Sequence, residues 1–219
     1  MEHIKANVRA VLNELPPGAQ LVVAGKGRSV PELMAAIEAG AGIIGENYLQ
    51  EAQEAFTSIG KTAQWHFIGH LQKNKVKTAV GIFDMIETLD SIELAREIDK
   101  RAAQICKTMS VLIEINSGCE PNKSGVMPQD VVRLAQELSP LNNIRVMGLM
   151  TMGPISPDPH ECRPYFKITR ELFEGLAKLC LPNISMTYLS MGMSDSYRVA
   201  LEEGANIVRI GTAIFGPRA

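Results

Sequence analysis

The sequence lacks the patterns that mark disulfide-rich, membrane-spanning and nucleic-acid-binding proteins. Its four cysteines include no Cys-x-x-Cys pair, so we expect reduced thiols and neither a zinc cluster nor a disulfide framework. No apolar run is long enough to span a bilayer, and residues 1–15 lack the continuous apolar segment of a signal peptide. Lys and Arg number 22 against 24 Asp and Glu, which provides no broad positive field for nucleic acid. These absences predict a soluble cytoplasmic protein that binds neither nucleic acid nor membrane.

What is present is typical of a packed globular protein. The 219 residues are 46% hydrophobic and 21% charged, which excludes a disordered or fibrous chain. This length allows one large domain or two small ones. Because no linker-like segment divides the sequence, we predict a single domain over residues 1–219.

From residue 20 onward, short apolar runs alternate with longer amphipathic ones, a rhythm typical of parallel α/β folds. The predicted strands are residues 20–25, 42–45, 64–69, 83–87, 110–116, 144–150, 184–190 and 206–210. The predicted helices between them are residues 31–39, 48–59, 72–80, 91–106, 128–138, 163–181 and 195–203. About eight such units in roughly 200 residues match the lower size limit of a (β/α)8 TIM barrel, with residues 1–15 as an extra N-terminal helix.

An open doubly wound sheet is the alternative to the barrel. Such a sheet usually carries a glycine fingerprint after its first strand, and residues 25–30 read Gly-Lys-Gly-Arg-Ser-Val at that point. This segment lacks the third glycine of G-x-G-x-x-G and also fails the Walker A pattern. The barrel is therefore favoured.

In a barrel, functional side chains gather at the carboxyl ends of the strands. The first strand ends near Lys26 and the eighth contains Arg209, and the two-residue period predicts that both point inward near the barrel mouth. Buried cations need a partner, which a phosphorylated ligand would provide. The simpler alternatives are a solvated Lys26 and an Arg209 that pairs with a barrel carboxylate such as Glu114.

Two glycine turns follow the last two strands. Residues 190–195 read as a strand end, a turn and a helix start with Ser194 as the N-cap, and Gly211 and Thr212 directly follow the eighth strand. Phosphate sites in these barrels often lie at this place. Ser194 alone would be explained as a helix cap, but its pairing with the second turn favours an anion site.

A desolvated lysine beside another cation can act as a nucleophilic amine and form a Schiff base. Lys26 and an anion site across the barrel mouth suggest pyridoxal 5′-phosphate (PLP), whose aldehyde and phosphate need two such anchors. A Schiff-base aldolase for a phosphorylated sugar would use similar parts, and spacing alone leaves both open.

Other polar candidates have plainer explanations. His66 and His70 are predicted to share a strand face, but no nearby carboxylate set completes a metal site, so we interpret them as core or hydrogen-bonding histidines. Residues 73–77 contain three lysines and are interpreted as a solvated helix face. No metal site is predicted.

Seven segments resemble the pyridoxal phosphate homeostasis (YggS/PROSC) family, whose barrel is similar to the N-terminal domain of alanine racemase. They are residues 22–26, 45–51, 65–75, 123–125, 148–150, 189–195 and 208–216. They occur in order over almost the whole chain, and the combination is specific although each piece is not. Family members commonly have Ser before the lysine and Thr after it, where this chain has Gly25 and Gly27. We expect this glycine pair to loosen Lys26.

The resemblance implies a site for PLP. It implies that Lys26 holds the cofactor as an internal aldimine and that Arg209 approaches the pyridine nitrogen. It further implies a phosphate site made by Ser194, Gly211 and Thr212. Asn47 and His66 are expected to line the site.

The resemblance also bears on activity. An arginine at the pyridine nitrogen weakens the ring as an electron sink, and the sequence ends three residues after Gly216, without room for the second domain of racemases. We therefore expect a monomeric PLP carrier or regulator that supplies apo-enzymes and has no catalytic residues. The alternatives are an amino-acid racemase or decarboxylase and, less favoured, the Schiff-base aldolase.

Overall fold

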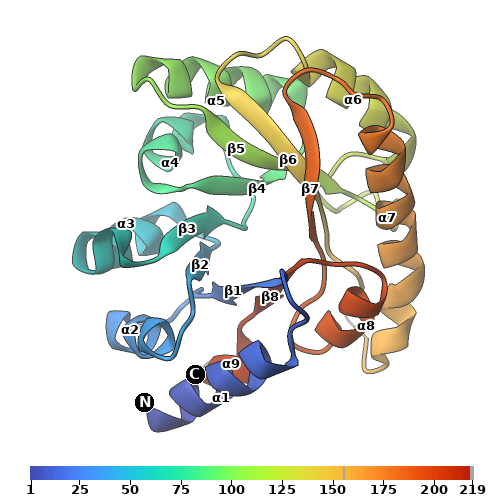
Figure 1. Ribbon diagram of the computed structural model, residues 1–219. Coiled ribbons are helices and arrows are strands. Elements are labelled where there is room, and N and C mark those ends of the chain that lie inside the picture. Colours follow the sequence, from blue (N-terminus) through green and yellow to red (C-terminus); the bar gives the residue numbers. More distant parts are fainter. Residues whose placement is uncertain (155, 218–219) are drawn as a thin grey trace.

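The computed structural model describes residues 1–154 and 156–217, and they form a closed barrel of parallel strands (Figure 1). The strands follow one another around the barrel in chain order, and β8 pairs with β1 to close it. They are β1 (Gln20–Ala24), β2 (Ile43–Glu46), β3 (Gln64–Phe67), β4 (Met85–Leu89), β5 (Met109–Ile115), β6 (Ile144–Thr151), β7 (Ile184–Ser190) and β8 (Ile207–Ile210).

Helices surround the strands and alternate with them along the chain. They are α1 (Glu2–Glu14), α2 (Val30–Glu38), α3 (Leu49–Ile59), α4 (Val76–Ile82), α5 (Ile92–Gln104), α6 (Val131–Leu138), α7 (Arg163–Ala177), α8 (Tyr197–Glu202) and α9 (Thr212–Phe215). The predicted (β/α)8 barrel with an N-terminal helix is confirmed. None of the helices described is both long enough and apolar enough to cross a membrane.

Three details differ from the predicted elements. The short helix α9 was not predicted, and a 3-10 turn (Lys73–Lys75) precedes α4 where a continuous helix was expected. The strand β3 ends at Phe67, so His70 lies beyond it and the predicted shared strand face of His66 and His70 is wrong. The three lysines between residues 73 and 77 are exposed, as predicted.

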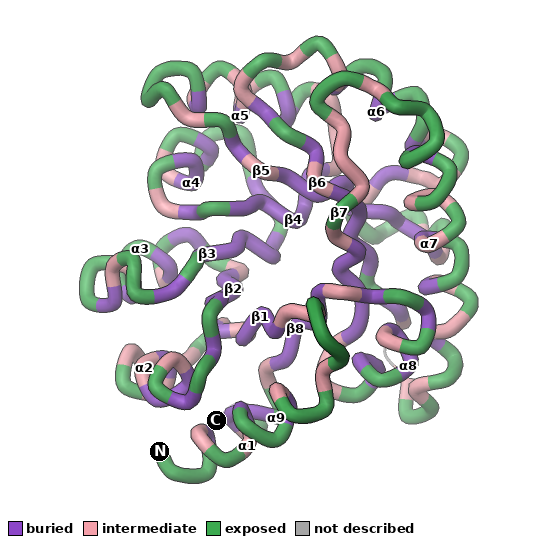
Figure 2. Tube along the Cα trace, viewed as in Figure 1, coloured by how far each residue is buried: buried purple, intermediate pink, exposed green. Residues whose placement is uncertain are grey.

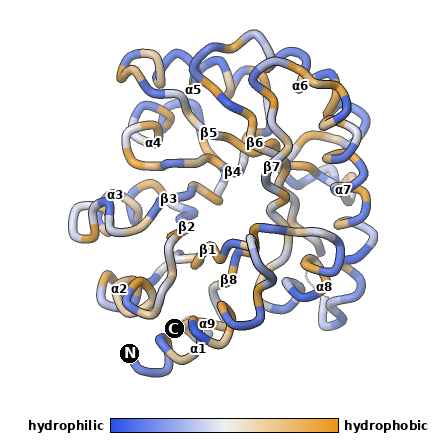
Figure 3. The backbone as a smooth tube through the Cα atoms, in the orientation of Figure 1, coloured by the Kyte–Doolittle hydropathy of each residue, from blue (hydrophilic) through white to orange (hydrophobic). Residues whose placement is uncertain are grey.

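The larger apolar core lies between the barrel wall and the helices. In α6 the buried residues are Val131, Leu134, Ala135 and Leu138, which recur every three or four positions and so occupy one helix face. Figure 2 shows buried residues along the strands and on the inward sides of the helices. The strands β5 and β6 are mainly hydrophobic in Figure 3, as expected for strands covered on both faces.

A smaller apolar layer fills part of the barrel interior. Val22, Ile43, Ile68 and Ile207 form one cluster on one side, and a second cluster contains Met85, Leu112 and Met150. Side chains alternate along a strand, so the next inward positions toward the carboxyl ends are Ala24 after Val22, Arg209 after Ile207 and Glu114 after Leu112. Lys26 follows two residues beyond Ala24, after the end of β1. The polar inward residues thus lie above an apolar floor.

Candidate functional site

Arg209 on β8 is buried in the barrel interior with 4% of its surface exposed. Its Nη1 donates to Ser190 Oγ and its Nη2 donates to the carbonyl oxygen of Thr151 at 2.8 Å. Nη1 also lies 3.8 Å from Glu87 Oε2. The simpler alternative, that Arg209 pairs with a barrel carboxylate, is confirmed, but among the described residues the carboxylate within 4 Å is that of Glu87 rather than Glu114.

Glu87 connects His66 to this network. Its Oε1 accepts from His66 Nδ1 at 2.7 Å and its Oε2 accepts from Ser190 Oγ at 2.6 Å. Burial opposes the charge of Glu87, but the hydrogen bond and charge of His66, together with Arg209, hold the pKa of Glu87 below its ordinary value. His66 is therefore a buried, hydrogen-bonded histidine, as the sequence predicted, and the network fixes the orientation of Arg209.

Lys26 lies in the turn that follows β1. Its Nζ is 4.9 Å from the centre of the Tyr48 ring, and among the described residues no carboxylate lies within 4 Å of it. The turn is held by hydrogen bonds from Arg28 N to Gly25 O and from Gly27 N to Glu51 Oε2, both 2.8 Å long. Lys26 thus presents an amine without an ion pair, on a turn that the backbone hydrogen bonds constrain.

The two glycines beside Lys26 occupy positions where a side chain would be unfavourable, each for a different structural reason. Gly27 has φ +68°, a conformation that L side chains rarely adopt. At Gly25 a Cβ atom would lie 2.3 Å from Glu46 Oε1, so the carboxyl group of Glu46 occupies the space of a side chain there. A serine before the lysine, common in the family that the sequence resembles, would require the carboxyl group of Glu46 to move.

Glu46, the last residue of β2, is a buried carboxyl group that sequence reasoning did not single out. It is 1% exposed, and its Oε2 has no hydrogen-bond partner among the described residues. Burial, with a smaller contribution from the charge of Glu51, raises the pKa of Glu46 to about 8. The carboxyl group is therefore mostly protonated at neutral pH, directly behind the lysine turn.

The last two strands end at a group of hydrogen-bond donors. Ser194 Oγ accepts from Gly211 N at 3.4 Å and from Ala213 N at 3.2 Å, which joins the turn after β7 to the start of α9. The prediction that Ser194 is the N-cap of the following helix is wrong, because Ser196 has that position in α8. Thr212 and Ala213 are exposed at this point. Backbone N–H groups and two hydroxyls are a suitable donor set for a phosphate.

The structure brings most of the predicted site residues to one side of the barrel mouth. Lys26, Ser194, Gly211 and Thr212 follow β1, β7 and β8, which are consecutive around the closed barrel. Asn47 follows β2, the next strand, and is half-buried. Arg209 and His66 lie lower, within the strands. An amine and a group of anion-binding donors are the two features that a phosphorylated aldehyde requires, and the guanidinium of Arg209 lies below them.

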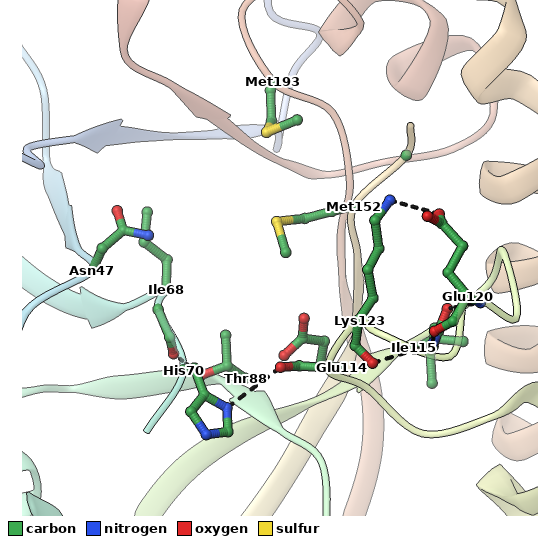
Figure 4. A pocket seen from close by; sticks show the side chains of 14 residues that line it. Asn47, Ile68, His70, Thr88, Glu114, Ile115, Glu120, Lys123, Met152 and Met193 are labelled. Carbon is green, nitrogen blue, oxygen red and sulfur yellow. Dashed lines mark hydrogen bonds and ion pairs between the residues drawn. The ribbon is translucent and has the colours of Figure 1, made fainter. Parts of the chain in front are cut away.

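A cavity of about 370 Å³ lies at the mouth, between the ends of β2 and β7 (Figure 4). We call it the mouth cavity. It is lined by Asn47, Ile68, Gly69, His70, Thr88, Glu114, Ile115, Asn116, Glu120, Lys123, Ser124, Met152, Gly153 and Met193. Sequence reasoning gave no sign of it, because its walls come from the ends of six strands, β2 to β7.

Comparison with known proteins identifies the family. The family model for the N-terminal domain of alanine racemase matches residues 1–219. The pyridoxal phosphate homeostasis protein of Aquifex aeolicus is 44% identical over 80% of this chain and 77% of its own length. That of Haemophilus influenzae is 37% identical over 91% of this chain and 85% of its own length.

The chain belongs to the pyridoxal phosphate homeostasis protein family. The resemblance stated from sequence motifs is thereby confirmed. Among solved structures, PipY of Synechococcus elongatus with PLP bound has a TM-score of 0.89 at 30% identity and covers 97% of this chain and 100% of its own. Alanine racemase of Clostridium difficile has a TM-score of 0.84 at 15% identity, covering all of this chain and 60% of its own, and shares the fold.

Proposed function

We propose that this protein binds PLP reversibly, attached to Lys26, and maintains the supply of PLP in the cell as a carrier or regulator rather than as an enzyme. The observation that carries the proposal is the amine of Lys26 in the turn after β1, which has no ion pair among the described residues and lies beside the donor group that follows β7 and β8. Relatives at 37–44% identity are named pyridoxal phosphate homeostasis proteins, and a solved relative holds PLP.

The residues present fit the cofactor. Ser194, Gly211 and Thr212 would hold its phosphate, since Ser194 Oγ and the first backbone N–H groups of α9 already meet there. Arg209 would approach the pyridine nitrogen from the barrel floor. Asn47, after β2, would border the ring, and His66 would act through Glu87 and Ser190 by fixing Arg209.

Arg209 explains why carriage is favoured over catalysis. When bound, PLP supplies an aldehyde that captures amines and a ring that withdraws electrons best when its nitrogen is protonated. A guanidinium that is buried and held by Ser190, Thr151 and Glu87 keeps a positive charge at that nitrogen and opposes its protonation. The site therefore holds the cofactor while limiting its reactivity.

The setting of this function is part of the proposal. We place the protein in the cytoplasm as a monomer that transfers PLP to apo-enzymes, in keeping with its four free cysteines, Cys106, Cys119, Cys162 and Cys180. We also propose that residues 1–219 fold as one domain.

Uptake of PLP by the purified protein tests the proposal. The wild type should turn yellow and develop an absorption band with added PLP, and Lys26→Ala should not. Lys77→Ala, which removes an exposed lysine on α4, is the matched control and should behave as the wild type. Sustained turnover of an amino acid at ordinary enzymatic rates would favour the racemase or decarboxylase instead. A colourless wild type that traps a phosphosugar on Lys26 would favour the aldolase.

A further inference from the structure

The mouth cavity holds a buried carboxylate that the proposed PLP site does not use. Glu114 on β5 is 4% exposed, and Figure 4 shows its carboxyl group directed into the cavity. Among the described residues its side chain accepts no hydrogen bond and forms no ion pair within 4 Å. Its carboxyl oxygens are not fully enclosed, so a hydrogen-bond donor that enters the cavity from outside the protein can reach them.

The basic side chains near Glu114 form hydrogen bonds or ion pairs with other residues. Arg209 is bound by Ser190 and Thr151. Lys123, at the cavity rim, lies 2.6 Å from Glu120 Oε1 and is neutralised by it. His70 Nδ1 lies 3.8 Å from Asp90 Oδ2 and 3.4 Å from Ser124 Oγ. None of these cations forms an ion pair with Glu114 among the described residues, so its carboxyl group faces the cavity without a cationic partner.

The remaining walls are largely apolar. Ile68 and Ile115 are buried, and the side chains of Met152 and Met193 face the cavity across from Glu114 (Figure 4). Thr88 Oγ1 is occupied by a hydrogen bond to the carbonyl oxygen of Gly69 at 2.6 Å. A volume of about 370 Å³ accommodates a small molecule. The lining thus combines one free acceptor with adaptable apolar contacts.

We propose that the mouth cavity is a second ligand site, which binds a small molecule with a primary ammonium group and an apolar body, and that Glu114 receives the ammonium. An anionic ligand is disfavoured because the carboxyl group of Glu114 repels it when ionised and lacks a positive charge in either form. Asn47 and Met193 line the cavity, and Met193 precedes Ser194 in the chain, so a bound amine lies next to the proposed cofactor site. This last consequence rests on the proposed function, whereas amine binding itself does not.

The charge state of Glu114 supports the choice of ligand. Burial, followed by the charge of Asp90, raises the pKa of Glu114 to about 7, and Arg209 opposes this shift. His70, Glu120 and Lys123 are the other titratable groups that line the cavity. An ammonium ion favours the ionised carboxylate, so binding should strengthen between pH 6 and pH 8 while the amine keeps its proton.

Titration of the PLP-free protein with n-pentylamine, followed by calorimetry or ligand NMR, tests the site. The uncharged analogue is n-pentanol. We expect saturable binding of the amine, at least tenfold weaker binding of the alcohol, and loss of this preference in Glu114→Gln. Glu171→Gln changes an exposed carboxylate on α7 and is the matched control, which should bind as the wild type does.

A second variant keeps the test decisive if Glu114→Gln does not fold. Met152 is 42% exposed at the cavity edge, so Met152→Trp should fold normally and reduce amine binding at least tenfold by filling the space. Equal binding of amine and alcohol, or no saturable amine binding, overturns the inference. Because PLP uptake is measured separately, amine binding without PLP uptake would overturn the proposed function alone.

Discussion

Glu46, Glu87 and Glu114 are buried carboxyl groups whose pKa values diverge because their neighbours differ. Glu87 meets His66, Ser190 and Arg209, so its charge is stabilised despite burial. Among the described residues, no side chain donates to Glu46 or Glu114, and burial raises their pKa values to about 8 and about 7 despite a backbone hydrogen bond from Asn47 to Glu46. Charge at the barrel mouth therefore depends on hydrogen-bond partners rather than on residue type.

The raised pKa of Glu46 predicts a pH dependence of stability. Between the ordinary value of 4.5 and about 8, the folded state keeps a proton that the unfolded state has released, so stability falls as pH rises through this window. In Glu46→Gln this fall should be smaller, because the amide does not ionise. Glu114 contributes in the same direction and remains in the variant.

Urea unfolding at pH 5.5 and pH 8 measures this effect. Glu54→Gln, an exposed carboxylate on α3, is the control and should keep the wild-type dependence. If the free energy of unfolding of Glu46→Gln changes between pH 5.5 and pH 8 as much as that of the wild type, Glu46 ionises normally in the folded protein.

Thr212→Val tests the phosphate assignment. The substitution keeps the side-chain shape and removes one hydroxyl at the exposed start of α9. We expect about tenfold weaker retention of PLP, the usual effect of losing one hydrogen bond to a charged group, with unchanged folding. Thr57→Val on α3 is the control for the substitution itself. Dialysis followed by absorbance compares the three proteins, and equal retention would remove Thr212 from the site.

At the scale of elements, the sequence predicted the strands and helices that are long enough to show a periodic hydrophobic pattern. All eight strands and the helices from α1 to α8 lie at the expected places, because apolar runs and amphipathic stretches alternate clearly. The helix α9 has four residues, too few for a period to appear. Ser194 was assigned as a cap because a serine before a helix is usual, but its hydroxyl instead receives N–H groups from a segment 17 residues later in the chain.

Gly148 sets the pairing between β6 and β7, which shifts register near this residue. It has φ +152°, and a Cβ atom would lie 1.8 Å from the carbonyl oxygen of Tyr188. Gly148→Ala should therefore destabilise the protein by at least about 2 kcal/mol. Gly175→Ala is the matched control. Gly175 lies within α7 with open space around it, so alanine should raise the free energy of unfolding by about 0.5–1 kcal/mol. Urea denaturation of both variants checks this, and a neutral Gly148→Ala would contradict the described register.

At the scale of the whole molecule, closure of the barrel brings together site residues that the sequence could predict only one at a time. The sequence predicted that Lys26, Arg209 and Thr212 stand at strand ends, and closure makes β1 and β8 neighbours, so these distant residues share one side of the mouth. It did not predict that Glu46 would fill the space beside Gly25 or that Arg209 would choose Glu87 over Glu114. Those contacts depend on how side chains from different strands pack, which cannot be predicted from the hydrophobic pattern along the chain.

Closure also predicts how the protein unfolds. Every strand of the barrel is paired on both sides, so no part of the sheet can leave without breaking the ring. If residues 1–219 are one domain, urea unfolding followed by Trp65 fluorescence and by far-ultraviolet circular dichroism should give a single coincident transition. Two separated transitions would contradict the single-domain proposal.

The most direct test of the central claim is mass spectrometry of the protein after incubation with PLP and reduction with borohydride. The account predicts one added pyridoxyl phosphate group per chain, located by peptide mapping on Lys26 and absent from Lys26→Ala. Attachment to another lysine in the wild type, or no attachment at all, would contradict it.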